Sequence, residues 1–210
     1  MKPVSIAVLV SGAGRGSNMT ALIEGCQQGV INGSVTLVIG VRADSPAMLK
    51  AAELGCRTLV IAPKSFDREE DYQNAVYDAL AGNGTDLVCL AGYMRLLGEK
   101  VLCAWRNRIM NVHPSLLPSF CGKGMYGHHV HEAALKRGVK YSGCTVHIVD
   151  ETYDTGPIVK QTVVPVEPGD TPDTLAARIL PNEHKTYVEC VRLFSLGKLK
   201  IRDGIVYIEE

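Results

Sequence analysis

Asn111 and His113 are separated by one residue in the stretch MNVHPSLLP, residues 110–118. The apolar residues before them predict a buried strand, and side chains two positions apart on a strand point to the same face. An amide can donate a hydrogen bond to a developing oxyanion, and an imidazole can transfer a proton near neutral pH. The pair therefore predicts chemistry at a carbonyl group. One alternative stays open, a histidine that only fills the core.

The residues that follow this pair favour the chemical interpretation. Pro114 and Pro118 stiffen the chain, and the next segment, CGKGMYGHH (residues 121–129), has the glycine content of a lid. The sequence contains neither a G-x-S-x-G motif nor a recognisable context for a nucleophilic cysteine. We therefore expect general acid–base catalysis without a covalent intermediate.

A second candidate site is the glycine-rich stretch SGAGRGSN, residues 11–18, which follows a predicted strand and opens a predicted helix. Backbone N–H groups at a helix N-terminus bind anions, and glycine lets a phosphate approach closely. The dinucleotide motif G-x-G-x-x-G fails because Ser17 stands at its third glycine, and the G-K-[ST] of a P-loop is missing. We predict a phosphate monoester site, and the alternative is a tight turn without a ligand.

The elements that position these residues alternate in the first half of the chain. Nearly continuous Val, Leu and Ile runs separated by helices are typical of a parallel sheet covered on both faces, which binds ligands beyond the carboxyl ends of its strands. Strands are predicted at residues 5–11, 35–41, 57–62 and 86–92, and helices at residues 17–29, 45–55 and 67–84.

The second half has a different pattern. Two long strands, residues 141–151 and 158–170, are joined by TYDTGP, and a closing helix at 171–197 is kinked or interrupted by Pro181. A terminal hairpin turns at Asp203 and Gly204. We expect an α/β, Rossmann-like fold with a mostly parallel twisted sheet, helices on both faces and a C-terminal half that completes the active site. The expected organisation is a single domain, 1–210, with halves 1–100 and 101–210.

Composition narrows the classes of function. The chain has 210 residues, 22 basic and 22 acidic residues, and 46% hydrophobic residues. Zero net charge gives no general attraction to nucleic acid or to anionic membranes, and no apolar run is long enough to span a bilayer. Seven cysteines without a C-x-x-C pair indicate reduced thiols, hence a cytoplasmic protein without a disulfide framework. We expect no metal site, including at His128, His129 and His131.

Five motifs occur together in one order: SGAGRGSN, AGYMRLL, NVHPSLLPSF, VHIVDETYDTGPIV and NEHKTYV. In this combination the chain resembles the glycinamide ribonucleotide transformylases, folate-dependent formyltransferases of purine synthesis, over residues 5 to 202. Related formyltransferases that act on methionyl-tRNA or nucleotide sugars typically carry glycine where this chain has Pro114. The expected single domain also lacks the additional domains that other formyltransferases and formyltetrahydrofolate hydrolases carry.

The resemblance implies transfer of a formyl group from 10-formyltetrahydrofolate to the amine of glycinamide ribonucleotide, without a metal. It assigns catalysis to Asn111, His113 and Asp154. Asn111 would bind the formyl oxygen, His113 as imidazolium would stabilise the oxyanion, and Asp154 would orient and charge the ring and accept the amine proton through water. By itself, the position of Asp154 before Thr-Gly-Pro favours a turn residue over a catalytic one.

The resemblance also assigns binding residues. The ribonucleotide would contact Gly16, Ser17, Asn18, Met19, Thr20 and Glu183. The folate would contact Arg68, Met94, Arg95, Leu96, Leu97, Asp150, Glu151, Thr152 and Tyr153. For the apolar residues among these, a place in the core remains the alternative. His147, inward on its strand, would support the site or be structural.

Two departures from the family pattern leave assignments open. The glycine loop is about two residues longer than usual, which adds Arg15 and shifts the register of Gly14 to Gly16. Arg68 matches a folate-contacting arginine only if the alignment slips by one position. Both partners are small molecules, and the sequence is compatible with a homodimer. Two competing functions are formyl transfer to another acceptor, water included, and a non-catalytic binding module on the same fold.

Overall fold

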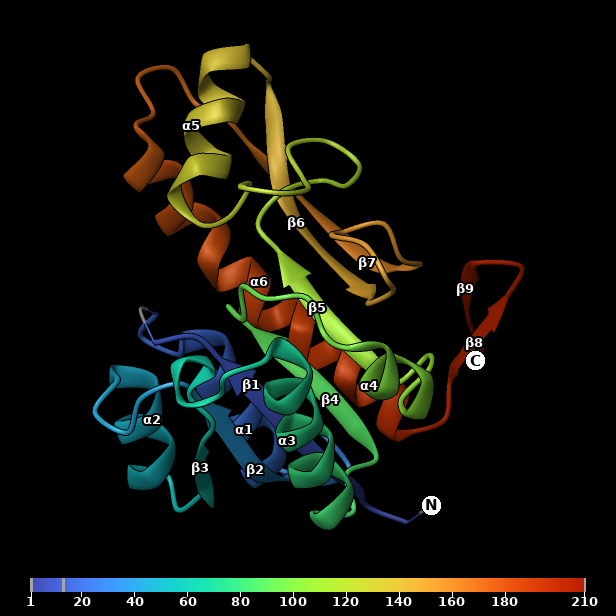
Figure 1. Ribbon diagram of the computed structural model, residues 1–210. Coiled ribbons are helices and arrows are strands. Elements are labelled where there is room, and N and C mark those ends of the chain that lie inside the picture. Colours follow the sequence, from blue (N-terminus) through green and yellow to red (C-terminus); the bar gives the residue numbers. More distant parts are fainter. Residues whose placement is uncertain (1, 13, 210) are drawn as a thin grey trace.

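One seven-stranded sheet runs through both halves of the protein, in the order β3-β2-β1-β4-β5-β6-β7. The structure is a computed structural model that describes residues 2–12 and 14–209. Figure 1 shows the sheet passing from the N-terminal elements to the long β6 and β7 strands. The strands are β1 (Val4–Val10), β2 (Gly33–Gly40), β3 (Thr58–Val60), β4 (Leu87–Ala91), β5 (Ile109–His113), β6 (Tyr141–Ile148) and β7 (Ile158–Pro165).

The sheet changes direction at β5. The pairs from β3 to β5 are parallel, whereas β6 is antiparallel to both β5 and β7. Every residue of β4 is buried, as expected for a parallel strand covered on both faces. The prediction of a mostly parallel α/β sheet is therefore confirmed.

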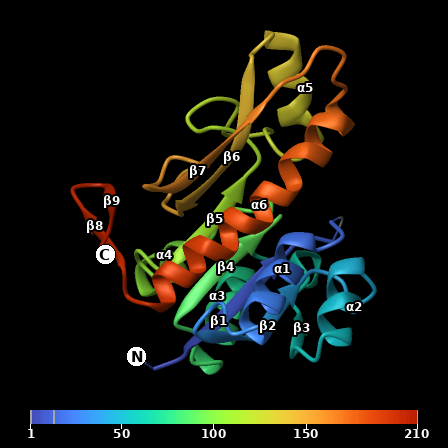
Figure 2. The same cartoon turned by 180° about the vertical axis from the view of Figure 1, so that it is seen from behind.

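Helices cover both faces of this sheet (Figures 1 and 2). On one face, the sheet packs against residues of α1, α2 and α6, such as Leu22, Met48 and Ile179. On the other face it packs against α3 and α4 through Tyr72, Val101 and neighbouring residues. The helices are α1 (Ser17–Gln27), α2 (Pro46–Glu53), α3 (Glu69–Gly82), α4 (Glu99–Ala104), α5 (His128–Arg137) and α6 (Pro172–Ser195), with a 3-10 turn η1 (Pro63–Ser65).

Helix α6 is the element that ties the two halves together. Its 24 residues run through Pro181 as one helix, so that of the two effects expected there, a kink or an interruption, the interruption is wrong. The helix begins with a capping box between Thr171 and Thr174. The buried Tyr187 hydroxyl donates to the carbonyls of Leu90 and Met110 at 3.1 and 2.8 Å, which attaches α6 to β4 and β5 close to the site.

The C-terminal hairpin pairs β8 (Leu199–Arg202) with β9 (Ile205–Ile208), as predicted from Asp203 and Gly204. Both turn residues have positive φ, 50° and 75°, as a two-residue hairpin turn of type I′ requires. The short helix α4 has no counterpart in the sequence-based prediction. Among the described residues, none forms a helix long and apolar enough to cross a membrane.

Candidate active site

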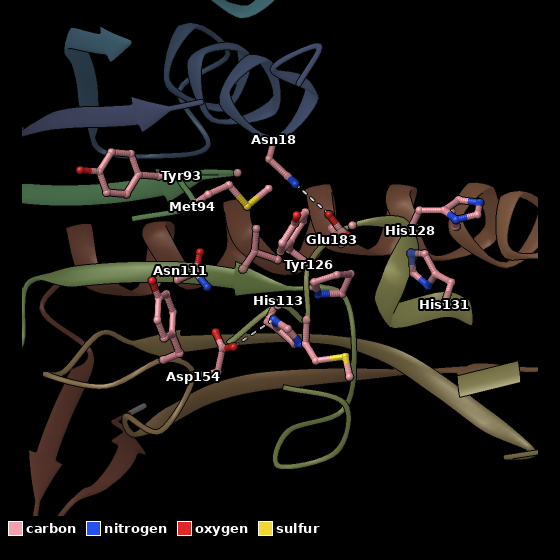
Figure 3. A pocket seen from close by; sticks show the side chains of 18 of the residues that line it. Asn18, Tyr93, Met94, Asn111, His113, Tyr126, His128, His131, Asp154 and Glu183 are labelled. Carbon is pink, nitrogen blue, oxygen red and sulfur yellow. Dashed lines mark hydrogen bonds and ion pairs between the residues drawn. The ribbon is translucent and has the colours of Figure 1, made fainter. Parts of the chain in front are cut away.

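A cavity of about 640 Å³ opens beyond the carboxyl ends of β4 and β5, where an α/β sheet binds its ligands. Its walls come from both halves of the chain, as Figure 3 shows. The cavity is lined by residues from four separate parts of the sequence: Asn18, Asn111 with His113, Asp154, and Glu183. The structure therefore brings the predicted catalytic residues and part of the predicted ribonucleotide-binding residues into one cavity.

His113 ends β5 with its ring between two acceptors. Its Nε2 lies 2.9 Å from the Phe120 carbonyl oxygen, and its Nδ1 lies 3.6 Å from Oδ2 of Asp154 (Figure 3). A carbonyl oxygen only accepts, so Nε2 carries the hydrogen. Phe120 and Asp154 both have positive φ, 52° and 58°, a conformation that a non-glycine residue adopts only at a cost in free energy. The backbone is thus strained at both residues that contact this imidazole, Phe120 through its carbonyl and Asp154 through its carboxylate.

The charge of the His113 ring is set by opposing effects. Burial lowers the pKa of His113 below its ordinary value of 6.5, and the neighbouring His147 lowers it too. The Asp154 carboxylate and the Phe120 carbonyl raise this pKa without compensating for burial. Asp154 therefore acts in the predicted direction, but the expectation that it keeps the ring charged neglected the larger effect of burial.

Asp154 is held by groups on three sides. Its Oδ2 accepts a hydrogen bond from the Gly122 backbone N–H at 3.0 Å, and its Oδ1 lies 3.6 Å from Nε2 of His147. Burial alone would raise the pKa of Asp154, but His147, the charge of His113 and the Gly122 N–H together lower it. The carboxylate therefore stays ionised beside the imidazole. Asp154 is both a turn residue and a cavity residue.

Asn111 is oriented by a histidine on the next strand. In the β5–β6 register Asn111 lies opposite His147, and the Asn111 Nδ2 is 3.1 Å from the His147 Nε2. His147 Nδ1 lies 3.0 Å from the Ile148 carbonyl, so Nδ1 carries the hydrogen and Nε2 accepts from the amide. One amide N–H of Asn111 remains for a ligand in the cavity.

The glycine loop ends at the start of α1, where backbone donors are available. Gly16 precedes the helix with φ +77°, and no side chain caps this end. A Cβ on Gly16 would lie 2.8 Å from the Ala47 Cβ, so glycine is required for space as well as for conformation. Ala13 of the predicted loop lies outside the described residues, and Arg15 is exposed.

Asn18 and Glu183 connect this loop to α6. The Asn18 amide donates to Oε2 of Glu183 at 2.8 Å, the contact drawn in Figure 3. Burial raises the pKa of Glu183, and the Asn18 bond opposes this only in part. Oδ1 of Asn18 is buried without a partner among the described residues. Met19 is in the core, and Thr20 follows it one position further along α1.

The structure separates the predicted folate residues into three groups. Met94 and Tyr153 line the first cavity. Leu97, Asp150 and Glu151 line a second cavity of about 690 Å³ next to α4 and the C-terminal hairpin. The other four line neither cavity. Leu96 is exposed, and Thr152 lies in the loop stabilised by Asp150. Both arginines form ion pairs, Arg95 with Glu69 and Arg68 with Glu70 and Asp71.

Several cavity residues escaped the sequence-based prediction. Lys123 and Tyr126 come from residues 121–129, which were expected to form a lid, whereas His128 and His131 belong to α5 and were considered only as metal ligands. Their apolar and basic types gave no signal, because their positions depend on how this segment folds over β5. Burial, together with neighbouring histidines, lowers the pKa of His131 to about 4, so its ring is neutral at pH 7.

His128 is occupied by carboxylates. Its two ring nitrogens lie 3.1 Å from Glu132 and 3.2 Å from Asp173, which links α5 to the start of α6. Within residues 2–12 and 14–209, no group of three or more His, Cys, Asp or Glu side chains has an arrangement suited to a metal ion.

Comparisons with known proteins agree with this geometry. The family model described as formyl transferase matches residues 4–191. The chain is 42% identical to the chloroplastic phosphoribosylglycinamide formyltransferase of Arabidopsis thaliana, covering 97% of this chain and 70% of that protein. It is 34% identical to the phosphoribosylglycinamide formyltransferase of Escherichia coli (strain K12), covering 98% and 94%.

A solved structure leads to the same family. Glycinamide ribonucleotide transformylase 1 from Symbiobacterium toebii superimposes with a TM-score of 0.93 at 42% identity, covering 100% of this chain and 95% of that one. The chain therefore belongs to the formyl transferase family, and within it to the phosphoribosylglycinamide formyltransferases.

Proposed function

We propose that this protein transfers the formyl group of 10-formyltetrahydrofolate to the amine of glycinamide ribonucleotide, a step of purine biosynthesis. The observation that carries the proposal is the convergence of Asn111, His113 and Asp154 on one cavity, beside the helix N-terminus that offers phosphate-binding donors. Family membership supplies the class of reaction. The geometry supplies the groups that this reaction needs.

The chemistry begins when the amine nitrogen attacks the formyl carbon and the formyl oxygen becomes an oxyanion. The N–H of Asn111 that His147 does not use can donate to this oxygen, because the amide is already held in orientation before substrate binds. The His113 ring lines the same wall, and its pKa rises when a negative charge develops beside it, so that the ring can carry a stabilising positive charge as the oxyanion forms.

The amine must lose a proton and the folate nitrogen must gain one when the carbon–nitrogen bond of the donor breaks. Asp154 is ionised and lies at the cavity wall beside His113, so it can accept the amine proton through a water molecule. The same proton then passes to the leaving nitrogen. Asp154 thus ends the cycle in the state in which it began.

On the acceptor side, we assign the phosphate to the backbone of Gly16, Ser17 and Asn18, with Met19 and Thr20 behind it. The support is a helix start that no side chain caps, so that its backbone N–H groups can bind an anion. We assign the ribose and glycinamide to Glu183, whose carboxyl group lines the same cavity next to Asn18.

On the donor side, we assign the folate to the segment after β4 and to the 150–154 loop, the two segments that border both cavities. Met94 and Tyr153 face the first cavity, where the formyl group must arrive, and Leu97, Asp150 and Glu151 face the second. Arg68 carries the weakest support of these residues, because its guanidinium is already paired.

The direct test is an assay with purified protein, 10-formyltetrahydrofolate and each of three acceptors: glycinamide ribonucleotide, methionyl-tRNA and water. We expect tetrahydrofolate to form only with glycinamide ribonucleotide, in equal yield with and without a chelator and without ATP. Release of formate without an acceptor would indicate a hydrolase, and binding of folate without turnover would indicate a binding module.

We also propose that the protein acts in the cytoplasm. All seven cysteines are free thiols in the structure, three of them buried, which suits a reducing compartment. Fractionation of the source cells with an antibody to the chain would test this, and recovery in an organelle or a secreted fraction would contradict it.

A further inference from the structure

Residues 93–98 form a wall shared by the two cavities. Tyr93 and Met94 line the first cavity, and Leu97 lines the second. Between the end of β4 and the start of α4, these residues belong to no helix or strand. Their position must therefore be set by side chains of other elements.

Gln73 of α3 holds this segment at two points. Its Nε2 donates to the Leu96 carbonyl at 3.1 Å, and its Oε1 accepts from the Gly98 backbone N–H at 2.8 Å. One planar amide thus satisfies a carbonyl and an N–H on either side of Leu97. The two bonds fix the backbone on both sides of the residue that faces the second cavity.

Gly98 and Glu69 show that the contact between Gln73 and residues 96–98 is close and that the orientation of the Gln73 amide is fixed. A Cβ on Gly98 would lie 2.9 Å from the Gln73 Cβ, so only glycine allows the two backbones to approach this closely. The Gln73 Nε2 also donates to Oε1 of Glu69 at 2.8 Å, one helical turn earlier. This bond sets which side of the amide carries the donor.

The same face of α3 holds the start of the segment. The Tyr72 hydroxyl lies 2.9 Å from the Tyr93 hydroxyl, and Arg95 stands over the Tyr72 ring at 5.1 Å while it pairs with Glu69. Glu69, Tyr72 and Gln73 are spaced i, i+3 and i+4, so they share one side of the helix. That side faces the back of the cavity wall.

From these contacts we infer that Gln73 is a positioning residue for the formyl donor. It touches neither cavity; it acts by holding residues 96–98, and through them the wall against which the folate is bound. This inference rests on the proposed function, since it takes the donor site to lie at that wall. Binding of glycinamide ribonucleotide at the acceptor site should not depend on Gln73.

The test is Gln73→Met, which keeps the length of the side chain and its helix propensity but removes both hydrogen bonds. We expect KM for 10-formyltetrahydrofolate to rise roughly fivefold to tenfold, since two partly exposed hydrogen bonds are lost. KM for glycinamide ribonucleotide and kcat at saturation should stay within about twofold. The dissociation constant of tetrahydrofolate should rise in parallel.

Gln27→Met is the matched control. Gln27 is also a helical glutamine whose amide donates to a backbone carbonyl, that of Leu54 at 3.3 Å, but it lines neither cavity. It should leave both KM values unchanged. If Gln73→Met does not fold, Gln73→Leu decides, because it also removes both hydrogen bonds without adding a charge next to Glu69 and should raise the same constant.

An unchanged folate KM in Gln73→Met, or equal losses in both KM values and kcat with a lowered Tm, would overturn the inference in favour of a merely structural role. Failure of the proposed function is separate from this outcome, since it would appear in the unmodified protein as a lack of product.

Discussion

The chain segments that follow β1 and that end β5 contribute different groups to one region of the protein: Asn18, near the start of α1, lines the same cavity as Asn111 and His113 of β5. After β1, the chain offers backbone N–H groups at the start of α1, where Gly16 allows the loop to pack closely against Ala47 of α2. At the end of β5, it offers an amide, an imidazole and, across the cavity wall, a carboxylate, each held by a second group. The groups after β1 can bind a phosphate, whose charge is present before the reaction. The groups at the end of β5 can stabilise the charge of the oxyanion, which develops during it.

This difference separates binding from catalysis in space. Backbone donors are fixed in number and cannot titrate, so they suit a phosphate whose charge is constant during the reaction. The groups around His113 have pKa values shifted in opposite directions by burial and by one another. Changes at the β5 end should therefore alter kcat, and changes at the β1 end should alter KM for the acceptor.

The strongest test of this division is His113→Asn. Loss of the ring should lower kcat by on the order of 10²–10⁴-fold, because proton movement and oxyanion stabilisation both depend on it. KM for glycinamide ribonucleotide should change by less than about threefold, as measured by steady-state kinetics. His129→Asn is the control: this histidine is exposed, pairs with Glu132 and does not line the cavity. A comparable loss in both variants would refute the assignment.

Asp154→Asn should have the next largest effect. The change keeps the shape and an acceptor for the Gly122 N–H but removes the charge, and Asp154 is the group that raises the His113 pKa against burial. The ring pKa should therefore fall further below 6.5, and the imidazolium fraction at neutral pH with it. We expect a loss in kcat of about 100-fold. NMR titration of the ring in both proteins, beside kcat, is the measurement; an unchanged ring pKa with normal kcat would make Asp154 a turn residue only.

Those parts of the fold and of the site that follow from a local sequence pattern could be predicted, whereas contacts between distant segments could not. Strands β1 to β4 follow from their apolar runs, and the shared face of Asn111 and His113 follows from their spacing. The approach of Asp154 came from resemblance to a family, because no local pattern brings a turn residue across the sheet. His147 could be placed on an inward face by alternation, but its partner depends on the antiparallel register of β5 and β6.

Other contacts were beyond a sequence-based prediction for a physical reason. The Phe120 carbonyl and the Gly122 N–H are backbone groups, and their aim is set by the path of the loop, not by residue type. The division of the predicted folate residues between two cavities has the same cause. Residues 150–154 are consecutive, yet Asp150 and Tyr153 face different spaces because the loop turns between them.

Removal of the phosphate from the acceptor tests the β1 end without changing the protein. Charge-assisted hydrogen bonds contribute about 1.5–3 kcal/mol each, so glycinamide riboside should have a KM higher by on the order of 10- to 100-fold. At saturation its kcat should approach that of the ribonucleotide, since the groups around His113 are untouched. Steady-state kinetics with both acceptors decide, and equal KM values would remove the phosphate from the glycine loop.

Gly16→Ala should have the smallest effect and isolates backbone geometry at the β1 end. The new Cβ would lie 2.8 Å from the Ala47 Cβ, and the residue must keep φ near +77°, so either α2 or the start of α1 must shift. We expect KM for glycinamide ribonucleotide to rise roughly tenfold while kcat stays within about twofold, because the donors move but the groups at β5 do not. Gly29→Ala is the matched control, since Gly29 has a similar φ of +72° but nothing within 4 Å of its Cβ position. It should lower Tm through backbone strain alone and leave KM unchanged. If the two alanine variants lowered Tm equally and neither changed KM, the loop would be a tight turn without a phosphate, and the contrast between the two strand ends would disappear.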